Sequence, residues 1–289
     1  MQFQGCYTAL VTPFRDGVVD YAALEALLEA QIAGGVAGVV PVGTTGESPT
    51  LNYREHDEVI EFVVRKVAKR VQVIAGTGAN STAEARELSR HAADVGADAT
   101  LQVTPYYNKP TGEGMYRHFS DVAEFSGIPI VLYNVPGRTG KEIPLDVIAR
   151  LSKHKLVGAV KEAAGSVERV NGIKDICDLP VLSGDDSLTV PMMAVGASGV
   201  ISVASNIIPA EVSEMVGAML SGNLARAFEL HHKYYPFFRD LFIESNPIPV
   251  KAAMGELKML KEEYRLPLCE MSDANRAKLL ATMKRVGLL

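Results

Sequence analysis

Short apolar runs alternate with longer amphipathic segments along the chain, up to about residue 205. Most of the runs are continuously hydrophobic and rich in Val, Ile and Ala, which is typical of parallel strands covered on both faces. The pattern predicts eight strands, at residues 7–13, 38–42, 72–76, 99–104, 129–134, 156–161, 180–183 and 199–204. Between strands it predicts amphipathic covering helices, among them residues 21–32, 53–67, 82–95 and 115–125.

Eight strand–helix units over about 200 residues favour a (β/α)8 barrel, with an open doubly wound sheet as the alternative. Ser81 followed by Glu84 is a helix-start signal, because the hydroxyl can cap a free N–H while the carboxylate reaches back. Beyond the barrel the strand signal disappears, and helices are predicted at residues 223–242, 249–263 and 273–286. We therefore predict a catalytic barrel at 1–222 and an appended C-terminal helical region at 223–289.

Composition excludes several classes of protein. The 289 residues carry a formal net charge of −5 and 47% are hydrophobic, as in an ordinary globular protein. This charge gives no basis for binding nucleic acid or an anionic membrane. The uncharged stretch 187–210 is long enough to span a bilayer, but Pro191, Gly196 and Gly199 interrupt it, so we expect it inside the barrel.

The cysteines indicate a cytoplasmic protein. There are three, far apart in the sequence, which excludes a disulfide framework and a Cys-x-x-Cys site. No basic residue precedes Arg15, so we expect no secretory leader in residues 1–14.

Enzymes with this barrel place their chemistry on loops that follow the C-terminal ends of the strands. Lys161 ends the sixth predicted strand, where apolar surroundings disfavour an ammonium and leave an amine able to attack a carbonyl. Tyr133 ends the neighbouring strand and is placed to shuttle protons. Two structural alternatives stay open at this point: a lysine that snorkels or pairs with Glu162, and a tyrosine that caps the barrel core.

Other motifs narrow the chemistry further. The turn at residues 43–46 offers two hydroxyls and closely spaced N–H groups, which suit a small carboxylate, although it can also be a simple glycine turn. The Gly-Thr-Gly at 76–78 lacks the third glycine of a dinucleotide loop, and the six histidines have no metal-ligand spacing. We therefore expect no metal, and carbonyl activation by an amine.

Taken together, these motifs resemble one family from end to end. The resemblance is carried by the segments GTTGE at 43–47, TPYYN at 104–108, YNVPGRTG at 133–140, KEA at 161–163 and NPIPVK at 246–251. In this order, they are similar to those of the dihydrodipicolinate synthase (4-hydroxy-tetrahydrodipicolinate synthase) family, within the pyruvate-dependent class I aldolase superfamily.

The resemblance implies a metal-independent lyase that condenses pyruvate with L-aspartate 4-semialdehyde on the diaminopimelate route to lysine. It implies that Lys161 forms a Schiff base with pyruvate, so that this covalent imine replaces any cofactor. Tyr133, Thr44 and Tyr107 would form a proton relay, with Tyr107 supplied across a dimer interface. Thr45 would hold the pyruvate carboxylate.

The resemblance also assigns the remaining substrate-binding positions and an assembly. Arg138 would hold the carboxylate of the semialdehyde, because a guanidinium suits bidentate binding. Gly184 and the carbonyl of Val203 would line the Schiff-base lysine. The family implies a homotetramer, a dimer of tight dimers.

A feedback site for lysine is implied at the tight-dimer interface. Its pattern maps onto Ser48, His56, Asn80, Glu84 and Tyr106. Pro49 and Tyr53 depart from the residues common in sensitive enzymes, yet the resemblance still implies inhibition by lysine. The structural alternative is that the five residues are ordinary polar groups of a loop and a helix face.

Two rival functions remain. N-acetylneuraminate lyase and keto-deoxy-sugar aldolases would share the fold, Lys161 and Tyr133, but Arg138 and Thr44 argue against them. A catalytically silent barrel that only binds pyruvate or an amino acid is the rival from another class. The complete set of lysine, two tyrosines and two threonines argues against it.

Overall fold

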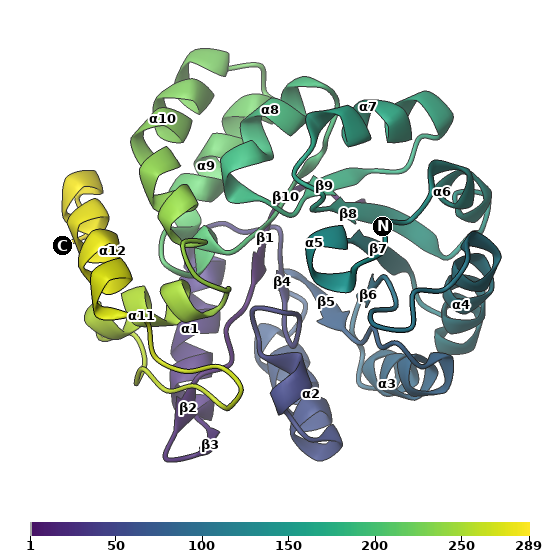
Figure 1. Ribbon diagram of the computed structural model, residues 1–289, viewed down its shortest axis with the longest axis horizontal. Helices are drawn as coiled ribbons and strands as arrows, with labels where there is room; N and C mark the ends of the chain where they lie inside the picture. The colour runs from purple at the N-terminus through teal and green to yellow at the C-terminus, as the bar shows by residue number, and fades with distance from the viewer. Residues whose placement is uncertain (1) are drawn as a thin grey trace.

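A closed barrel of eight parallel strands forms the centre of the computed structural model, which describes residues 2–289 (Figure 1). The strands lie in the order β1-β10-β9-β8-β7-β6-β5-β4, and β1 pairs with both β10 and β4. Their bounds are β1 (Gly5–Ala9), β4 (Gly38–Val40), β5 (Gln72–Gly76), β6 (Ala99–Val103), β7 (Ile130–Asn134), β8 (Val157–Glu162), β9 (Val181–Ser183) and β10 (Gly199–Ser202). The predicted (β/α)8 barrel is confirmed, and the open sheet is excluded. Met1 lies outside the described residues. It is the first residue of the predicted barrel region and of the segment 1–14, which was expected to contain no secretory leader.

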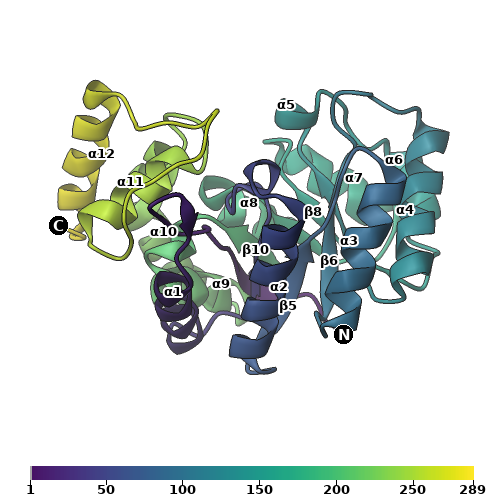
Figure 2. The same cartoon turned by 90° about the horizontal axis from the view of Figure 1, so that it is seen from below.

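Helices surround the barrel, and the last three lie together on one side of it (Figures 1 and 2). Around the barrel are α1 (Tyr21–Ala33), α2 (Tyr53–Val67), α3 (Thr82–Asp94), α4 (Gly112–Ser126), α6 (Leu145–Leu151), α7 (Val167–Ile176), α8 (Thr189–Ala194) and α9 (Pro209–Leu220). The short α5 (Pro136–Thr139) lies inside this ring, at the end of the barrel (Figure 1). The C-terminal helices are α10 (Leu224–Asp240), α11 (Ile248–Glu256) and α12 (Asp273–Val286). Short 3-10 helices are η1 (Ser48–Thr50), η2 (Asp186–Leu188) and η3 (Ala204–Asn206).

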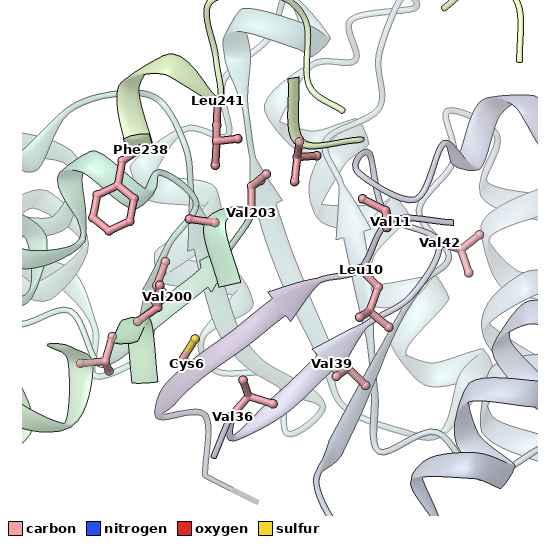
Figure 3. Close-up of a cluster of buried hydrophobic side chains, with 14 of the residues drawn as sticks. Cys6, Leu10, Val11, Val36, Val39, Val42, Val200, Val203, Phe238 and Leu241 are labelled. Atoms are coloured by element: carbon pink, nitrogen blue, oxygen red, sulfur yellow. The ribbon is translucent and has the colours of Figure 1, made fainter. Parts of the chain in front are cut away.

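Two hydrophobic layers follow from the alternation of side chains along each strand. One layer fills the barrel interior, with Tyr7, Ile74 and Leu182 among its members. The other lies between the strands and the helices, where Val200 and Phe238 belong to one buried cluster (Figure 3). The outer layer thus joins α10 to the barrel.

The uncharged stretch at residues 187–210 is part of the barrel, as expected from its prolines and glycines. It contains α8 and β10, and β10 pairs with β1 and β9. Across residues 2–289, none of the helices combines the length and apolarity that a bilayer span requires.

Two local predictions need correction. A helix starts after Ser81, as predicted, but the Ser81 side chain accepts no capping hydrogen bond. A complete capping box occurs instead at α2, between Asn52 and Glu55. The helix predicted at 249–263 ends at Glu256, because the chain leaves the helical conformation near Lys258, whose φ is 58°. The segment that follows α11 reaches the loop after β4, where the N–H of Arg265 donates to Glu47.

A small hairpin of β2 (Phe14–Arg15) and β3 (Val18–Val19) was not predicted. Its turn is Asp16-Gly17, and both residues have positive φ values, 55° and 83°. An Asp-Gly pair is a strong hairpin signal, so the sequence did carry this information.

Candidate active site

Lys161 lies on β8 and points into the barrel. Ala159 belongs to the apolar cluster inside the barrel and Val160 to the cluster beneath the helices, so Lys161 shares the inner face with Ala159. It is in register with Tyr133 of β7, and its Nζ lies 4.2 Å from the centroid of the Tyr133 ring. Lys161 is only 6% exposed. The structure therefore brings the predicted amine and phenol together near the barrel mouth.

Glu162 lies on the outer face of β8 and is buried. The side-chain amide of Asn134 donates to both of its oxygens at 2.9 and 3.0 Å, and the N–H of Ala164 donates at 2.9 Å. Burial raises the pKa of Glu162, while these hydrogen bonds oppose the increase. Among residues 2–289 its ion-pair partner is Arg169, at 3.5 Å. The alternative in which Lys161 pairs with Glu162 is therefore wrong.

The loop at residues 43–47 follows β4 and turns sharply over the barrel mouth. Val42, just before the loop, and Glu47, its last residue, have positive φ values of 54° and 55°. Thr44 and Thr45 between them line the same cavity as Lys161. The Thr45 hydroxyl also accepts a hydrogen bond of 2.9 Å from Asn246 in the C-terminal region.

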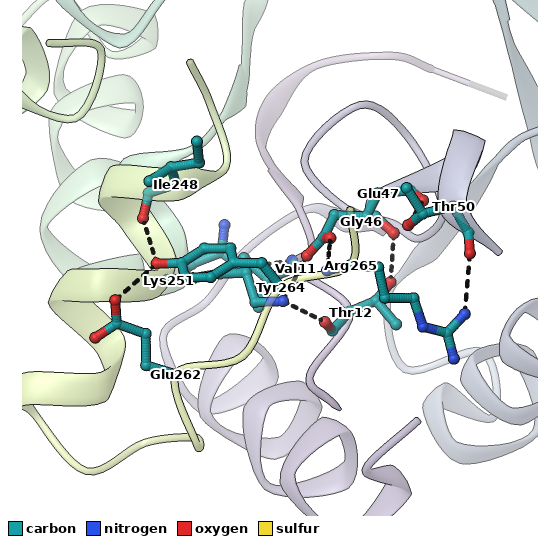
Figure 4. Close-up of polar contacts among 11 residues, drawn as sticks. Val11, Thr12, Gly46, Glu47, Thr50, Ile248, Lys251, Glu262, Tyr264 and Arg265 are labelled. Atoms are coloured by element: carbon teal, nitrogen blue, oxygen red, sulfur yellow. Dashed lines mark hydrogen bonds and ion pairs between the residues drawn. The ribbon is translucent and has the colours of Figure 1, made fainter. Parts of the chain in front are cut away.

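A buried ion pair fixes this loop to α11 (Figure 4). Nζ of Lys251 lies 2.5 Å from Glu47 Oε1 and donates to the carbonyl of Thr12 at 3.2 Å, and both charged side chains are fully buried. Burial lowers the pKa of Lys251, against the opposing effect of the Glu47 charge. The N–H of Arg265 donates to the second Glu47 oxygen at 3.3 Å. These contacts hold the catalytic loop from the C-terminal side.

Sequence reasoning assigned no role to Glu47 or Lys251. Each is the final residue of a motif that carries the family resemblance. The two motifs consist mostly of apolar or small residues, and they end in opposite charges. This pattern could have indicated a buried ion pair.

A cavity of about 140 Å³ collects most of the predicted substrate groups. Seven of those residues line it: Thr44, Thr45, Tyr133, Arg138, Lys161, Gly184 and Val203. Phe242 and Asn246 of the C-terminal region also line it, and the sequence did not single them out as site residues. The predicted division of the chain at residue 222 stays a prediction, but the site draws on both sides of it.

Gly184 and Asp186 shape the wall beside the lysine. A Cβ at Gly184 would lie 2.6 Å from Cβ of Ala163 and 3.2 Å from Cε of Lys161, so a larger residue would displace the lysine. Asp186 is buried, and its Oδ2 accepts a hydrogen bond of 3.0 Å from the N–H of Val203. Asp186, which was not predicted as a site residue, thus fixes the backbone that presents Val203.

Arg138 lies on α5 with its side chain at the cavity wall. One Nη donates to the carbonyl of Asn246 at 3.3 Å. The ion pairs formed within residues 2–289 do not include Arg138, so its remaining donors are available to an anionic ligand.

A larger cavity of about 670 Å³ adjoins the first and shares Thr44, Tyr133 and Arg138 with it. Four of the five predicted lysine-site residues line this larger cavity: Ser48, His56, Glu84 and Tyr106. The fifth, Asn80, is not part of the lining but donates to the carbonyl of Tyr106 at 3.3 Å.

The two residues that depart from the feedback pattern, Pro49 and Tyr53, line the larger cavity as well. The Tyr53 phenol has a raised pKa, because its hydrogen bond to Glu84 and the negative charge of Glu84 both favour the protonated form. Nε2 of His56 is hydrogen-bonded to the carbonyl of Gly76 at 3.0 Å, and its buried Nδ1 has no hydrogen-bond partner within residues 2–289.

Tyr107 is the predicted catalytic residue that the single chain does not bring to the lysine cavity. It is 89% exposed, has a φ of 70° and lines neither cavity. Its predicted role is in the site of a neighbouring copy, so that role stays a prediction.

No group of three or more His, Cys, Asp or Glu side chains within residues 2–289 is arranged to hold a metal ion. The polar groups that line the cavity at the mouth include the hydroxyls of Thr44 and Thr45, Arg138, Asp185 and the amine of Lys161.

The fold and the site define a (β/α)8-barrel protein whose candidate nucleophile is a buried lysine at the barrel mouth. The model of the dihydrodipicolinate synthetase family matches residues 2–286. The chain belongs to this family, and the resemblance found in the sequence is confirmed.

Individual relatives are similar to this chain along almost its whole length. The 4-hydroxy-tetrahydrodipicolinate synthase of Geotalea daltonii is 53% identical over 289 residues, which cover 99% of this chain and 100% of that protein. The dihydrodipicolinate synthase of Acinetobacter baumannii, solved in complex with pyruvate, has a TM-score of 0.97 at 44% identity and 99% coverage of both chains. The enzyme of Cyanidioschyzon merolae, solved with lysine bound, has a TM-score of 0.96 at 40% identity and the same coverage.

Proposed function

We propose that this lyase condenses pyruvate with L-aspartate 4-semialdehyde through an imine on Lys161. The observation that carries the proposal is the position of the lysine: buried, 4.2 Å from the Tyr133 ring centre, and without Glu162 as an ion-pair partner. The family relationship and the pyruvate bound by the Acinetobacter baumannii relative support this substrate.

The imine supplies the chemistry that the condensation needs. The Lys161 amine attacks the keto carbon of pyruvate, and loss of water gives a protonated imine. This cation is an electron sink, so a methyl proton can leave to give an enamine. The enamine carbon attacks the aldehyde, the adduct closes through its own amino group, and Lys161 is released. As proposed, the reaction needs no bound cofactor or metal.

The side chains around Lys161 suit these steps. Tyr133 and Thr44 line the lysine cavity, where their hydroxyls would move protons to and from the carbinolamine. Thr45 would bind the pyruvate carboxylate from the loop that Glu47 and Lys251 fix. Gly184 and the carbonyl of Val203 would leave space for the small keto acid.

Arg138 would hold the carboxylate of the semialdehyde. Its guanidinium faces both cavities and is not neutralised by a carboxylate of the described chain, 2–289. A planar fork of donors binds a carboxylate more specifically than an ammonium does.

A coupled assay tests the proposed function. Pyruvate and aspartate semialdehyde are supplied, and NADPH oxidation by dihydrodipicolinate reductase is followed. Turnover supports the proposal. Absence of turnover, with a pyruvate adduct still trapped on Lys161 by borohydride, would move the second substrate to a sugar-derived aldehyde. Absence of both would leave only the silent binding barrel.

We also propose a homotetramer built from two tight dimers, in which Tyr107 enters the site of the neighbouring copy. Tyr107→Phe is expected to lower turnover by about 10- to 1000-fold, because the relay loses a proton-transferring hydroxyl. Turnover of the variant and its mass in solution are measured together. Unchanged turnover in an assembled variant would remove Tyr107 from the mechanism.

Lysine is proposed as a feedback inhibitor that binds in the larger cavity. Glu84 would bind its α-amino group, and the lysine-bound Cyanidioschyzon merolae relative supports such a site. Glu84→Gln is expected to raise the lysine concentration for half inhibition by roughly tenfold or more, because a hydrogen bond to a charged group is lost. Glu61→Gln, an exposed change on α2, is the matched control. Equal inhibition of both variants would contradict this site.

A cytoplasmic location is proposed on the basis of the cysteines. Cys6, Cys177 and Cys269 are all unpaired in the structure, which suits a reducing compartment.

A further inference from the structure

Asp185 lines the lysine cavity but has no part in the mechanism proposed above. It lies between β9 and η2, and hydrogen bonds fix its backbone: the Ser183 hydroxyl accepts from its N–H at 3.2 Å, and the Thr189 hydroxyl donates to its carbonyl at 3.1 Å. The side chain of Asp185 is not held in the same way: its Oδ2 is inaccessible to solvent and receives no hydrogen bond from residues 2–289.

The two other carboxylates beside the lysine strand are fully provided with partners. Glu162 receives hydrogen bonds from Asn134 and Ala164, and Asp186 receives them from Ser202 and the N–H of Val203. Of these three carboxylates, Asp185 is the one with an oxygen that lacks a hydrogen-bond donor within residues 2–289. Burial raises its pKa, the charge of Asp186 adds to this, and the charge of Lys161 opposes it. Asp185 as a whole is partly buried, but removing its Oδ2 from water without a donor costs free energy, which a cationic ligand with N–H donors would offset.

The second substrate of the proposed reaction is an amino acid and carries such a cation. Arg138 of α5 and Asp185 of the β9 loop line one cavity of about 140 Å³. A small amino acid in this cavity finds a guanidinium for its carboxylate and a carboxylate for its ammonium.

We propose that Asp185 binds the ammonium group of the semialdehyde and carries its protons during ring closure. The inference rests on the proposed function. Asp185 and Lys161 line the same cavity, so the carboxylate faces the space in which the imine forms. The ammonium is thereby held close to the carbon that it must attack.

The ring-closing step then balances. The bound ammonium gives a proton to Asp185, and the free amine forms a bond to the imine carbon while the imine electron pair moves to Lys161. The bond between that carbon and Lys161 then breaks. Asp185 transfers two protons, one after the other, from the ring nitrogen to the departing lysine nitrogen. Lys161 leaves as an ammonium, and the ring retains a protonated imine.

Asp185→Asn tests the proposal, because it removes the charge and keeps the shape. The matched control is Asp175→Asn, an exposed change on α7. We measure borohydride trapping of pyruvate on Lys161, the KM for aspartate semialdehyde, and inhibition by succinate semialdehyde, which is the same aldehyde without the amino group.

In Asp185→Asn, the KM for aspartate semialdehyde is expected to rise about 10- to 100-fold, as expected for loss of a hydrogen bond to a charged group. Trapping of pyruvate and inhibition by succinate semialdehyde should be unchanged. The wild-type enzyme should itself prefer aspartate semialdehyde to the desamino aldehyde by a similar factor, which tests the inference even if the variant does not fold.

Three results would overturn the inference. Equal weakening of both aldehydes would assign Asp185 a general structural role. Loss of pyruvate trapping would make it the counter-charge of the imine instead. An unchanged KM would remove it from binding. If wild-type protein traps no pyruvate, it is the proposed function itself that fails.

Discussion

Lys161→Met is expected to abolish both imine formation and turnover. The methionine side chain fills a similar volume inside the barrel but has no amine, so the keto carbon of pyruvate has no nucleophile. Loss of a nucleophile from a catalytic set typically lowers turnover by several orders of magnitude, and we expect a loss on the order of 10⁴-fold or more. The coupled assay measures turnover, and borohydride trapping measures the adduct.

The control is Lys174→Met, which makes the same change at an exposed position of α7. It should retain wild-type activity. Substantial turnover in Lys161→Met, with the fold intact by circular dichroism, would show that the reaction does not pass through this lysine.

Lys251→Met is expected to cause the largest loss of stability among single changes at the site. The substitution leaves Glu47 as a fully buried carboxylate without its cationic partner. Breaking a buried pair from one side typically costs about 3–5 kcal/mol, and we expect a decrease of this size in the free energy of unfolding. Urea denaturation at a fixed protomer concentration measures it, since assembly adds to apparent stability.

The double variant Glu47→Leu, Lys251→Met is the matched control. Replacing both charges with apolar groups removes the unpaired carboxylate and should restore much of the lost stability. It should not restore turnover fully, because the loop that carries Thr44 and Thr45 loses its fixed connection to α11. A Lys251→Met protein as stable as the wild type would contradict the role given to this pair.

The barrel could be predicted from the sequence because its determinants are local and repetitive. Eight apolar runs of strand length at regular spacing leave few architectures that cover both faces of a sheet. The position of Lys161 at a strand end, in register with Tyr133, then follows from the topology. The same reasoning placed Thr44, Thr45 and Gly184 at one rim, whereas Arg138 was assigned from the family resemblance.

Contacts between distant segments could not be predicted in this way. The approach of Asn246 to Thr45 and of Lys251 to Glu47 depends on how the segment before α11 returns over the barrel, and no periodicity encodes that path. The length of α11 was overestimated for the same reason, because the segment after it is held by tertiary hydrogen bonds such as that of Tyr264 to the Ile248 carbonyl (Figure 4). The role of Tyr107 requires a second copy of the chain.

The central claim, a pyruvate imine on Lys161, is tested most directly by trapping and locating the adduct. Wild-type protein is incubated with pyruvate, reduced with borohydride, digested and mapped by mass spectrometry. The account predicts one pyruvate-dependent adduct, on the peptide that contains Lys161. A pyruvate adduct on another lysine, or none under conditions where the coupled assay shows turnover, would contradict it.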